Sequence, residues 1–449
     1  MMRENNQYTM AKEIVATLQN CGYIAYFAGG CVRDMLRGQR EFNDIDIATS
    51  ARPDQVRAVF KRVVPVGESF GVMLVLCGKT SFEVATFRRD SSYSDGRHPD
   101  HVYFSTPQED ARRRDFTING MYYDPLTDEI HDYIGGQKDL EKQRISTIGD
   151  AKERFAEDYL RMLRAVRFAA RFSYTIDAAT RDAITLLAQN ITRVSAERIF
   201  QELDKMMRGP TPDIALALLD ELGLLQYVLP EVAAMKGVAQ PEEFHPEGDV
   251  FAHTKQVLSF LPTHPSSSLA WAALLHDVGK PPTQTFEDRI RFSGHNTVGA
   301  RMAEKILRRL RGSNKLCDEV VAMIDNHMNF MHVQQMRKGK IKRFLSRPTI
   351  EEEIVLHRAD CLASHGDTDN CRFLRSIQEE FREEDLRPEP LLRGKDLIAL
   401  GLSPSPRFGK LLSAVYELQL EEEVETREEA LAWVKKISPK RMVCIGERT

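Results

Sequence analysis

The 449-residue chain lacks the features that mark several special classes of protein. No apolar run approaches the roughly 18 residues that a membrane-spanning helix needs, and Val72–Cys77 is among the longest. The first ten residues are polar and contain no apolar signal-peptide core. We therefore expect a cytoplasmic globular protein without a membrane partner. At about 150 residues per domain, the length suggests two to four domains.

Cysteine and net charge are also low. The seven cysteines are widely spaced and include no C-x-x-C pair, which argues against a disulfide framework and against a thiolate zinc site. The 66 acidic and 62 basic residues leave a net charge of −4, so any site for a polyanion must be a local basic patch.

Residue patterns divide the chain into four parts. Residues 1–145 mix helix and strand signals, with strands expected at Ile24–Ala28, Val72–Cys77 and Phe82–Phe87. Residues 146–240 are helical in pattern, and residues 241–380 are helical and contain nine of the 12 histidines. Residues 381–449 form a charged helical tail. This order predicts an α+β protein with a mixed head followed by all-helical parts.

Two acidic residues follow a glycine turn in the head. Gly29 and Gly30 stand between a predicted strand and a predicted helix, a pattern that alone most often marks only a tight turn. Asp44 and Asp46 then alternate with isoleucines, which places both carboxylates on one face of a strand. Because such carboxylates repel each other, a hard cation such as Mg²⁺ with bound phosphate oxygens would stabilise them.

Together these residues resemble the signature of the nucleotidyltransferase superfamily that includes DNA polymerase β. Further blocks narrow the resemblance to class II tRNA nucleotidyltransferases and bacterial poly(A) polymerases. They are R-R-D-F-T-x-N at Arg113–Asn119, D-x-x-G-G-x-x-D-L at Asp132–Leu140 and E-D-x-x-R at Glu157–Arg161. The resemblance implies a polymerase-β-like head at 1–145 and a neck and body at 146–240 that bind nucleotide and tRNA.

The resemblance also implies roles for single residues. Asp44 and Asp46 would be catalytic and would hold Mg²⁺, with Glu83 as a candidate third carboxylate. Asp158 and Arg161, three apart on a predicted helix, would share a face and read the edge of a base; the alternative is a surface ion pair. The other residues implied in nucleotide binding are Gly30, Arg33, Arg113, Arg114, Asn119, Arg164 and Arg167.

The activity implied is template-independent addition of CMP and AMP, from CTP and ATP, to the 3′ end of tRNA. The polar segment Arg88–Pro99 resembles a loop that CC-only relatives lack, so it favours CCA addition or A-only addition. The basic arginines on Arg164–Arg171 would contact phosphates or pair with nearby acids. A-only addition or a poly(A) polymerase is the alternative within the family.

A second constellation lies in residues 241–380. Imidazole and carboxylate groups are good ligands for divalent metals, and His276-Asp277 on an apolar helix would be costly to bury without a cation. The pattern H…HD…H…H…D resembles the HD superfamily of metal-dependent phosphohydrolases. The resemblance implies core metal ligands at His253, His276, Asp277 and Asp360, with His295 and His327 as candidates for a second metal.

The HD resemblance leaves the metal open among Mg²⁺, Mn²⁺, Ni²⁺ and Fe²⁺. It implies hydrolysis of phosphate esters, and we expect 2′,3′-cyclic phosphates or damaged 3′ ends as substrates. A hypothesis from another class is an RNA-binding HD phosphohydrolase whose transferase head is inactive.

Overall fold

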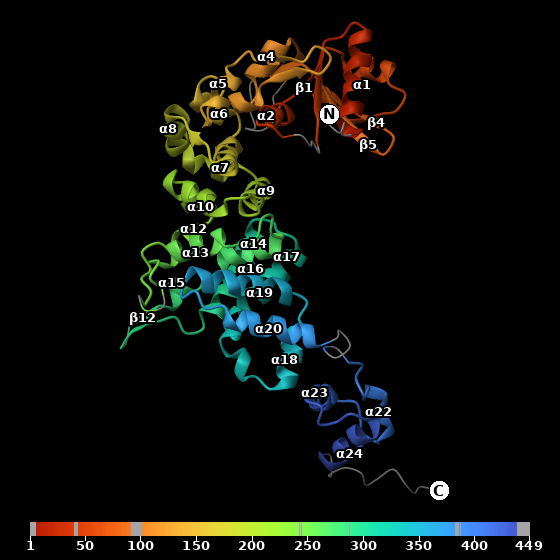
Figure 1. The fold of residues 1–449 in the computed structure, drawn as a ribbon, viewed down its shortest axis with the longest axis vertical. Helices are drawn as coiled ribbons and strands as arrows, with labels where there is room; N and C mark the ends of the chain where they lie inside the picture. Colours follow the sequence, from red (N-terminus) through yellow and green to blue (C-terminus); the bar gives the residue numbers. More distant parts are fainter. Residues whose placement is uncertain are drawn as a thin grey trace. The chain divides into compact units, whose positions relative to one another are not determined.

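The computed structural model describes residues 6–39, 44–90, 101–241, 243, 245–286, 288–381, 386 and 388–437 (Figure 1). The chain separates into two compact units, residues 1–233 with 309–312 and residues 234–308 with 313–449. The first contains a large sheet and the second is almost entirely helical, so the predicted α+β class is confirmed. Among the described residues, no helix is long and apolar enough to cross a membrane.

The head is built on a seven-stranded sheet with the order β3-β4-β5-β2-β1-β8-β9. Only the β2–β5 pair is parallel among the described pairs of this sheet. Strands β4 and β5 form a hairpin, with Gly78 at a φ of 64° in its turn. The strands are β1 Ala25–Ala28, β2 Asp46–Thr49, β3 Val63–Gly67, β4 Val72–Cys77, β5 Thr80–Thr86, β8 Tyr122–Asp124 and β9 Glu129–His131.

One face of this sheet carries the core of the head. Alternate residues of the strands, among them Phe27, Ile47 and Val84, are buried against Ile14 and Leu18 of α1 (Asn6–Asn20). Because side chains alternate along a strand, the residues next to these point to the opposite face. That opposite face is where the acidic residues of β2 and β5 lie.

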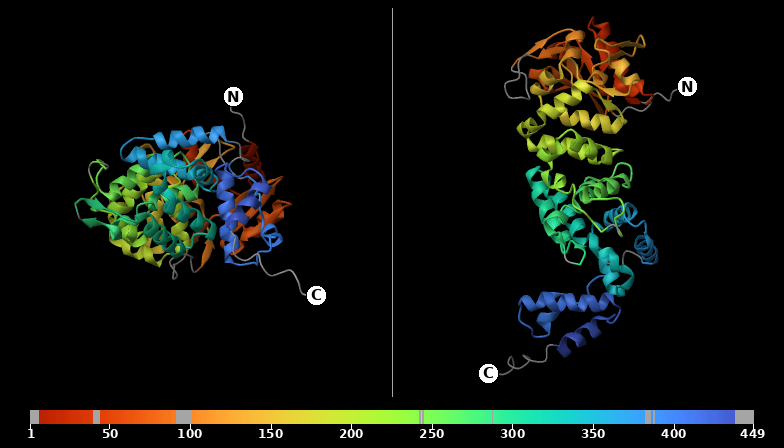
Figure 2. Two further views of the ribbon diagram at one scale, coloured as in Figure 1. Left: turned by 90° about the horizontal axis from the view of Figure 1, so that it is seen from below. Right: turned by 90° about the vertical axis from the view of Figure 1, so that its left-hand side faces the viewer.

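Helices follow the sheet in the first unit, and the two-stranded parallel pair β10 (Arg144–Ile145) and β11 (Thr175–Ile176) is a small exception to the all-helical expectation. Helix α7 (Leu160–Phe172) packs against two later helices, α9 (Ala196–Met207) and α10 (Pro212–Glu221), as the yellow and green segments of Figure 2 show. The others are α2 Gly30–Leu36, α3 Pro53–Val59, α4 Pro107–Arg112, α5 Gly136–Glu141, α6 Ala151–Glu157, α8 Ala178–Leu187, α11 Leu225–Val228 and α12 Pro230–Ala233.

The second unit is organised around an apolar helix. Every residue of α14 (Ser267–Leu275) after the first is buried, including Trp271, and α14 packs against α13, α17 and α19. The tail helices α22, α23 and α24 share a separate small core. The helices are α13 Val250–Ser259, α15 Lys280–Thr283, α16 His295–Arg309, α17 Asn314–Asn326, α18 Lys338–Leu345, α19 Ile350–Ala363, α20 Asp369–Glu380, α22 Gly394–Ala399, α23 Pro406–Leu420 and α24 Arg427–Ile437, with one hairpin of β12 Thr285–Phe286 and β13 Ile290–Arg291.

A buried carboxylate in the head binds several donors at once. Asp110 of α4 accepts hydrogen bonds from Arg113 at 2.9 Å, from Arg114 at 3.1 and 3.2 Å and from the Tyr122 hydroxyl at 2.6 Å. Burial alone raises the pKa of Asp110, but the charges of the two arginines and the hydrogen bonds lower it to about 2. The ionised carboxylate therefore contributes to the stability of the head.

We predict that Asp110→Asn lowers the free energy of unfolding of the head by about 3–5 kcal/mol at pH 7, because it removes the buried negative charge that pairs with two partly buried guanidinium groups. Urea-dependent hydrogen exchange of peptides covering β1 and β8 measures this, since both tryptophans lie in the second unit. The folded pKa is depressed, so the stabilisation is present above about pH 4 and is lost as the pH falls toward 2. A difference from wild type that does not shrink below pH 4 would contradict this origin. Asp182→Asn, at an exposed position on α8, is the control and should change neither the free energy of unfolding of the head nor its dependence on pH.

Candidate functional site

A cleft of about 510 Å³ in the first unit contains most of the predicted transferase residues. Seven arginines line it, which is the local basic patch that the overall charge of −4 required. The predicted residues that line it are Gly30, Arg33, Asp46, Arg113, Arg114, Asn119, Asp158, Arg161, Arg164 and Arg167.

Three carboxylates gather at one edge of this cleft. Asp44 and Asp46 are exposed and alternate with buried isoleucines, as predicted, but β2 begins at Asp46, so Asp44 precedes the strand rather than lying within it. The parallel register pairs Ile47 with Val84, so Glu83 stands beside Asp46 on the same face. Partial burial, followed by the charges of Asp44 and Glu83, raises the pKa of Asp46 to about 6. The carboxylates of Asp44, Asp46 and Glu83 offer the hard oxygen ligands that Mg²⁺ prefers, and a bound Mg²⁺ would offset their mutual repulsion.

The glycine turn lies directly beside these carboxylates. Gly29 has a φ of 75°, a conformation that favours glycine, and a Cβ added there would lie 3.0 Å from a guanidinium nitrogen of Arg114. The register pairs Ala28 with Asp46, which holds the turn next to the acidic edge. A side chain at Gly29 would therefore push against the basic wall of the cleft.

A hydrogen-bonded chain of side chains connects the head to α7. The buried Arg33 guanidinium donates to the Asn119 amide oxygen at 2.5 Å, and the Asn119 amide donates to Asp115 at 3.1 Å. The other oxygen of Asp115 accepts from Arg164 at 2.7 Å. Burial raises the pKa of Asp115, but Arg164 outweighs it and the pKa falls to about 2. Residues that are far apart in sequence thus form one ionised network along the cleft.

The helical placement predicted for Asp158 is wrong. Helix α6 ends at Glu157, and Asp158 has an extended backbone with φ −156° and ψ 103° before α7 begins at Leu160. One oxygen of Asp158 accepts the Leu160 N–H at 3.1 Å. Short aspartate side chains compete in this way for free N–H groups at helix starts. The break in the helix, rather than a shared helical face, places Asp158 in the cleft.

The alternative that Asp158 and Arg161 form an ion pair is also wrong. Asp158 accepts from Arg198 of α9 at 2.6 Å. Arg161 forms an ion pair with Glu157 and donates to the carbonyl of Arg154 at 2.9 Å. Both predicted base-reading groups therefore line the cleft with separate partners. Arg198 could not be predicted from the sequence, because it is 40 residues from its partner and carries no motif spacing.

The arginines of α7 are paired with acids. Arg164 binds Asp115, and Arg167 donates to the buried Glu202 at 2.6 Å. Both still line the cleft. The expected acid pairing is thus confirmed for these two arginines, and it fixes the direction of their guanidinium groups.

The segment between β6 (Arg88–Asp90) and β7 (Val102–Phe104) is only partly covered by the structure. These two short strands pair with each other at the ends of the segment. Most of the predicted Arg88–Pro99 loop lies outside the described residues.

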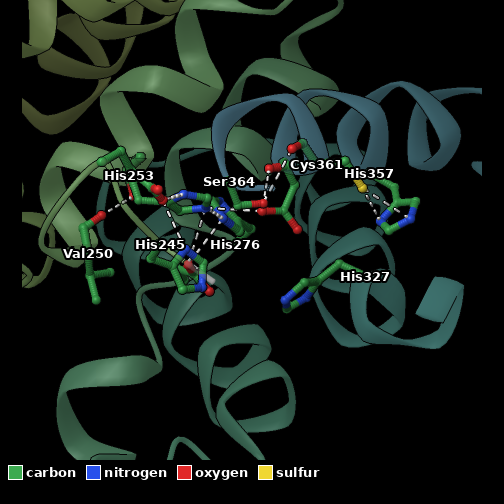
Figure 3. Close-up of polar contacts among 12 residues, drawn as sticks. His245, Val250, His253, His276, His327, His357, Cys361 and Ser364 are labelled. Carbon is green, nitrogen blue, oxygen red and sulfur yellow. Dashed lines mark hydrogen bonds and ion pairs between the residues drawn. The ribbon is translucent and has the colours of Figure 1, made fainter. Parts of the chain in front are cut away.

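The second unit brings the predicted HD residues together. The Nε2 atom of His253 lies 3.4 Å from that of His276 and 3.0 Å from an oxygen of Asp360. An oxygen of Asp277 lies 3.2 Å from the same His276 nitrogen. Figure 3 shows His253 and His276 side by side, with His327 turned toward them and His357 set apart beside Cys361. These side chains come from α13, α19 and the segment that follows α14, except for His327, which directly follows α17.

A second group of ligands adjoins the first. The other oxygen of Asp277 lies 3.5 Å from Nε2 of His295, which lies 3.2 Å from Nε2 of His327. Burial and the charges of the neighbouring His276 and His295 together lower the pKa of His327 to about 4. Facing Nε2 atoms at these separations suit two donors to one cation, and Asp277 offers one oxygen to each group. The donor set therefore fits two divalent cations.

The carboxylates around His253 in the first group of ligands also favour a bound cation. Burial alone lowers the pKa of His253, but hydrogen bonds to Asp360 and Glu247 raise it to about 9. The carboxylates thus favour positive charge at this place. Glu247 is the second residue that could not be predicted from the sequence, because it precedes α13 and matches no part of the HD pattern.

Family comparisons cover the same three regions. Residues 25–146 match the model described as the poly A polymerase head domain, and residues 173–236 match the probable RNA and SrmB-binding site of polymerase A. Residues 250–364 match the HD domain.

Relatives and solved structures extend the match. A CCA-adding enzyme of Oceanobacillus iheyensis is 45% identical over 218 residues, which are 48% of this chain and 54% of that relative. A CCA-adding enzyme of Lactococcus lactis is 32% identical over 96% of this chain and 98% of its own length. The Bacillus stearothermophilus CCA-adding enzyme in complex with CTP aligns with a TM-score of 0.75 and 26% identity, covering 97% of this chain and 99% of that one. With a full-length relative above 30% identity and the two sites in place, the chain belongs to the CCA-adding enzyme family.

Proposed function

We propose that this protein adds CMP and AMP, from CTP and ATP, to the 3′ end of tRNA without a nucleic-acid template. The observation that carries the proposal is that one cleft contains both the acidic edge at Asp46 and the side chains of Asp158 and Arg161. The relatives support it: they are CCA-adding enzymes, and solved structures of such enzymes contain CTP, ATP or tRNA.

At the acidic edge, Asp44 and Asp46 would hold Mg²⁺, with Glu83 beside them. A bound Mg²⁺ supplies charge neutralisation at the triphosphate and activates the attacking hydroxyl. Arg33 and Asn119 stay in fixed positions at the cleft wall through their mutual hydrogen bond, so they bind phosphate or ribose oxygens without reorganisation. Arg113 and Arg114 are oriented by Asp110 in the same way.

Selection of the base would depend on complementary hydrogen bonding by Asp158 and Arg161. A carboxylate accepts and a guanidinium donates, so the pair offers both halves of a base edge. Arg164 and Arg167 contribute positive charge beside them for the phosphates.

We further propose four functional parts: the transferase head at 1–145, the neck and body at 146–240, the HD domain at 241–380 and the helical tail at 381–449. A cytoplasmic location agrees with these proposed tRNA substrates.

A second function is proposed for the HD domain: metal-dependent hydrolysis of phosphate esters. It is carried by the convergence of four histidine Nε2 atoms and two aspartates in one buried cluster. The ligands proposed for the core cation are His253, His276, Asp277 and Asp360, and the metal would be Mg²⁺, Mn²⁺, Ni²⁺ or Fe²⁺. A bound cation supplies an activated hydroxide there.

Acceptor length distinguishes the transferase hypotheses. Purified protein is incubated with tRNAs that end in the discriminator base, C or CC, together with one labelled nucleotide at a time. We expect CMP incorporation on the two shorter acceptors and AMP incorporation only after CC. AMP alone would indicate A-only addition, and no incorporation on any acceptor would support the hypothesis of an inactive head.

Separate substitutions should separate the two activities. We predict that Asp46→Ala reduces nucleotide transfer by about 100-fold or more, because it removes a ligand from the acidic edge, while hydrolysis of a phosphodiester by the HD domain is unchanged. Asp277→Ala is the matched variant, with the opposite pattern. Loss of both activities in either folded variant would contradict two independent sites.

We predict that Asp158→Ala relaxes the choice of nucleotide. The ratio of kcat/KM between a preferred nucleotide, CTP or ATP, and UTP should fall by about 10-fold, the equivalent of roughly 1–2 kcal/mol of hydrogen bonding. The Mg²⁺ dependence should not change. An equal loss with every nucleotide, at unchanged ratios, would count against base reading by Asp158.

A further inference from the structure

The four histidines of the HD cluster are oriented through the ring nitrogen that faces away from the cluster. In three of them Nδ1 bonds a main-chain carbonyl three residues earlier. The pairs are His276 with Ala273 at 2.9 Å, His295 with Phe292 at 2.8 Å and His327 with Ile324 at 2.6 Å. Each Nδ1 donates its proton to a neutral acceptor, and Nε2 is left with a lone pair toward the cluster.

His253 differs from the other three. Its Nδ1 lies 2.5 Å from a carboxylate oxygen of Glu247, which stands in the segment before α13. The carbonyl three residues before His253, that of Val250, accepts the Thr254 hydroxyl at 2.8 Å instead (Figure 3). The Glu247 side chain is only 6% exposed, and its second oxygen has no hydrogen-bond partner among the described residues.

The same carboxylate oxygen also bonds Nδ1 of His245 at 2.9 Å. These three residues do not fit a further metal site. Metal ligands lie about 2.0–2.2 Å from the ion, so two donors of one ion stand clearly farther apart than the 2.5 Å between His253 and Glu247. The contact is therefore a hydrogen bond, and Glu247 acts on His253 rather than on a cation.

A carboxylate affects an imidazole ligand more strongly than a carbonyl does. It fixes the tautomer with the proton on Nδ1, orients the ring, and makes Nε2 a stronger donor because its negative charge balances the charge drawn toward a cation. In this cluster, within the described residues, only His253 has a carboxylate at its Nδ1.

We infer that Glu247 is a positioning residue that makes the cation position at His253, His276 and Asp360 the tighter of the two in the HD domain. The position at His295 and His327 contains histidines oriented only by neutral carbonyls, so it is the weaker one. This inference rests on the proposed HD metal centre. Beyond that centre, we infer that its two cation positions differ in affinity and that Glu247 causes the difference.

Cobalt binding tests the inference without an activity assay. The full chain is used with Asp46→Ala, which removes a carboxylate of the head, and Co²⁺ uptake is followed by the visible absorption of histidine-bound cobalt. We expect two phases of binding. Glu247→Ala should weaken the tight phase by about 10–100-fold and leave the weak phase unchanged, and Glu247→Gln, which still accepts the Nδ1 proton but has no charge, should lie between.

Asp249→Ala is the matched control, two residues from Glu247 at the N-cap of α13. Asp249 caps α13 by accepting the Ala252 N–H at 2.7 Å, so its loss should lower the melting temperature without weakening the tight phase. The inference is overturned if Glu247→Ala leaves the tight phase unchanged, or if it weakens both phases equally. If the Asp46→Ala chain binds no Co²⁺ at all, the HD metal centre itself is refuted, which is a different result from a tight phase that survives the loss of Glu247.

Discussion

The basic cleft of the first unit depends on the pairing of partly buried arginines with buried acids. Positive charge is needed to bind a triphosphate, yet guanidinium groups that repel one another inside a protein destabilise it. Asp110, Asp115 and Glu202 are each buried and each contact at least one arginine of the cleft. These acids allow many cations to line a small volume, and they also determine where each guanidinium points.

This pairing links parts of the chain that are distant in sequence. The sequence of contacts from Arg33 through Asn119 and Asp115 to Arg164 spans from the helix after the first strand to α7. The acidic edge at Asp46 and the groups at Asp158 and Arg161 are therefore held along one continuous wall. A ligand that contacts both the acidic edge and the groups at Asp158 and Arg161 would bind side chains that are already preorganised.

Much of this could be predicted from the sequence, for a physical reason. The alternation around Asp44 and Asp46 has the period of a strand. The histidine-aspartate pattern of the second unit predicts a metal site, because burying these polar side chains on apolar helices without a cation would be costly. Partners such as Arg198 for Asp158 and Glu247 for His253 could not be predicted in the same way. The first is a contact between the break that precedes α7 and the separate helix α9, and the second depends on a segment without regular structure. The break at Asp158 was missed because one side-chain hydrogen bond outweighed an otherwise helical pattern.

The raised pKa of Asp46 has a consequence for how the head binds its cation. A carboxylate with a pKa of about 6 is partly protonated in mildly acidic solution, because burial and then the negative charges of Asp44 and Glu83 disfavour its ionised form. A proton and a divalent cation would compete for the same oxygen atoms, so cation binding at the proposed site would release a proton to the solvent. The repulsion among the three acids would then make occupancy of this proposed cation site depend on pH.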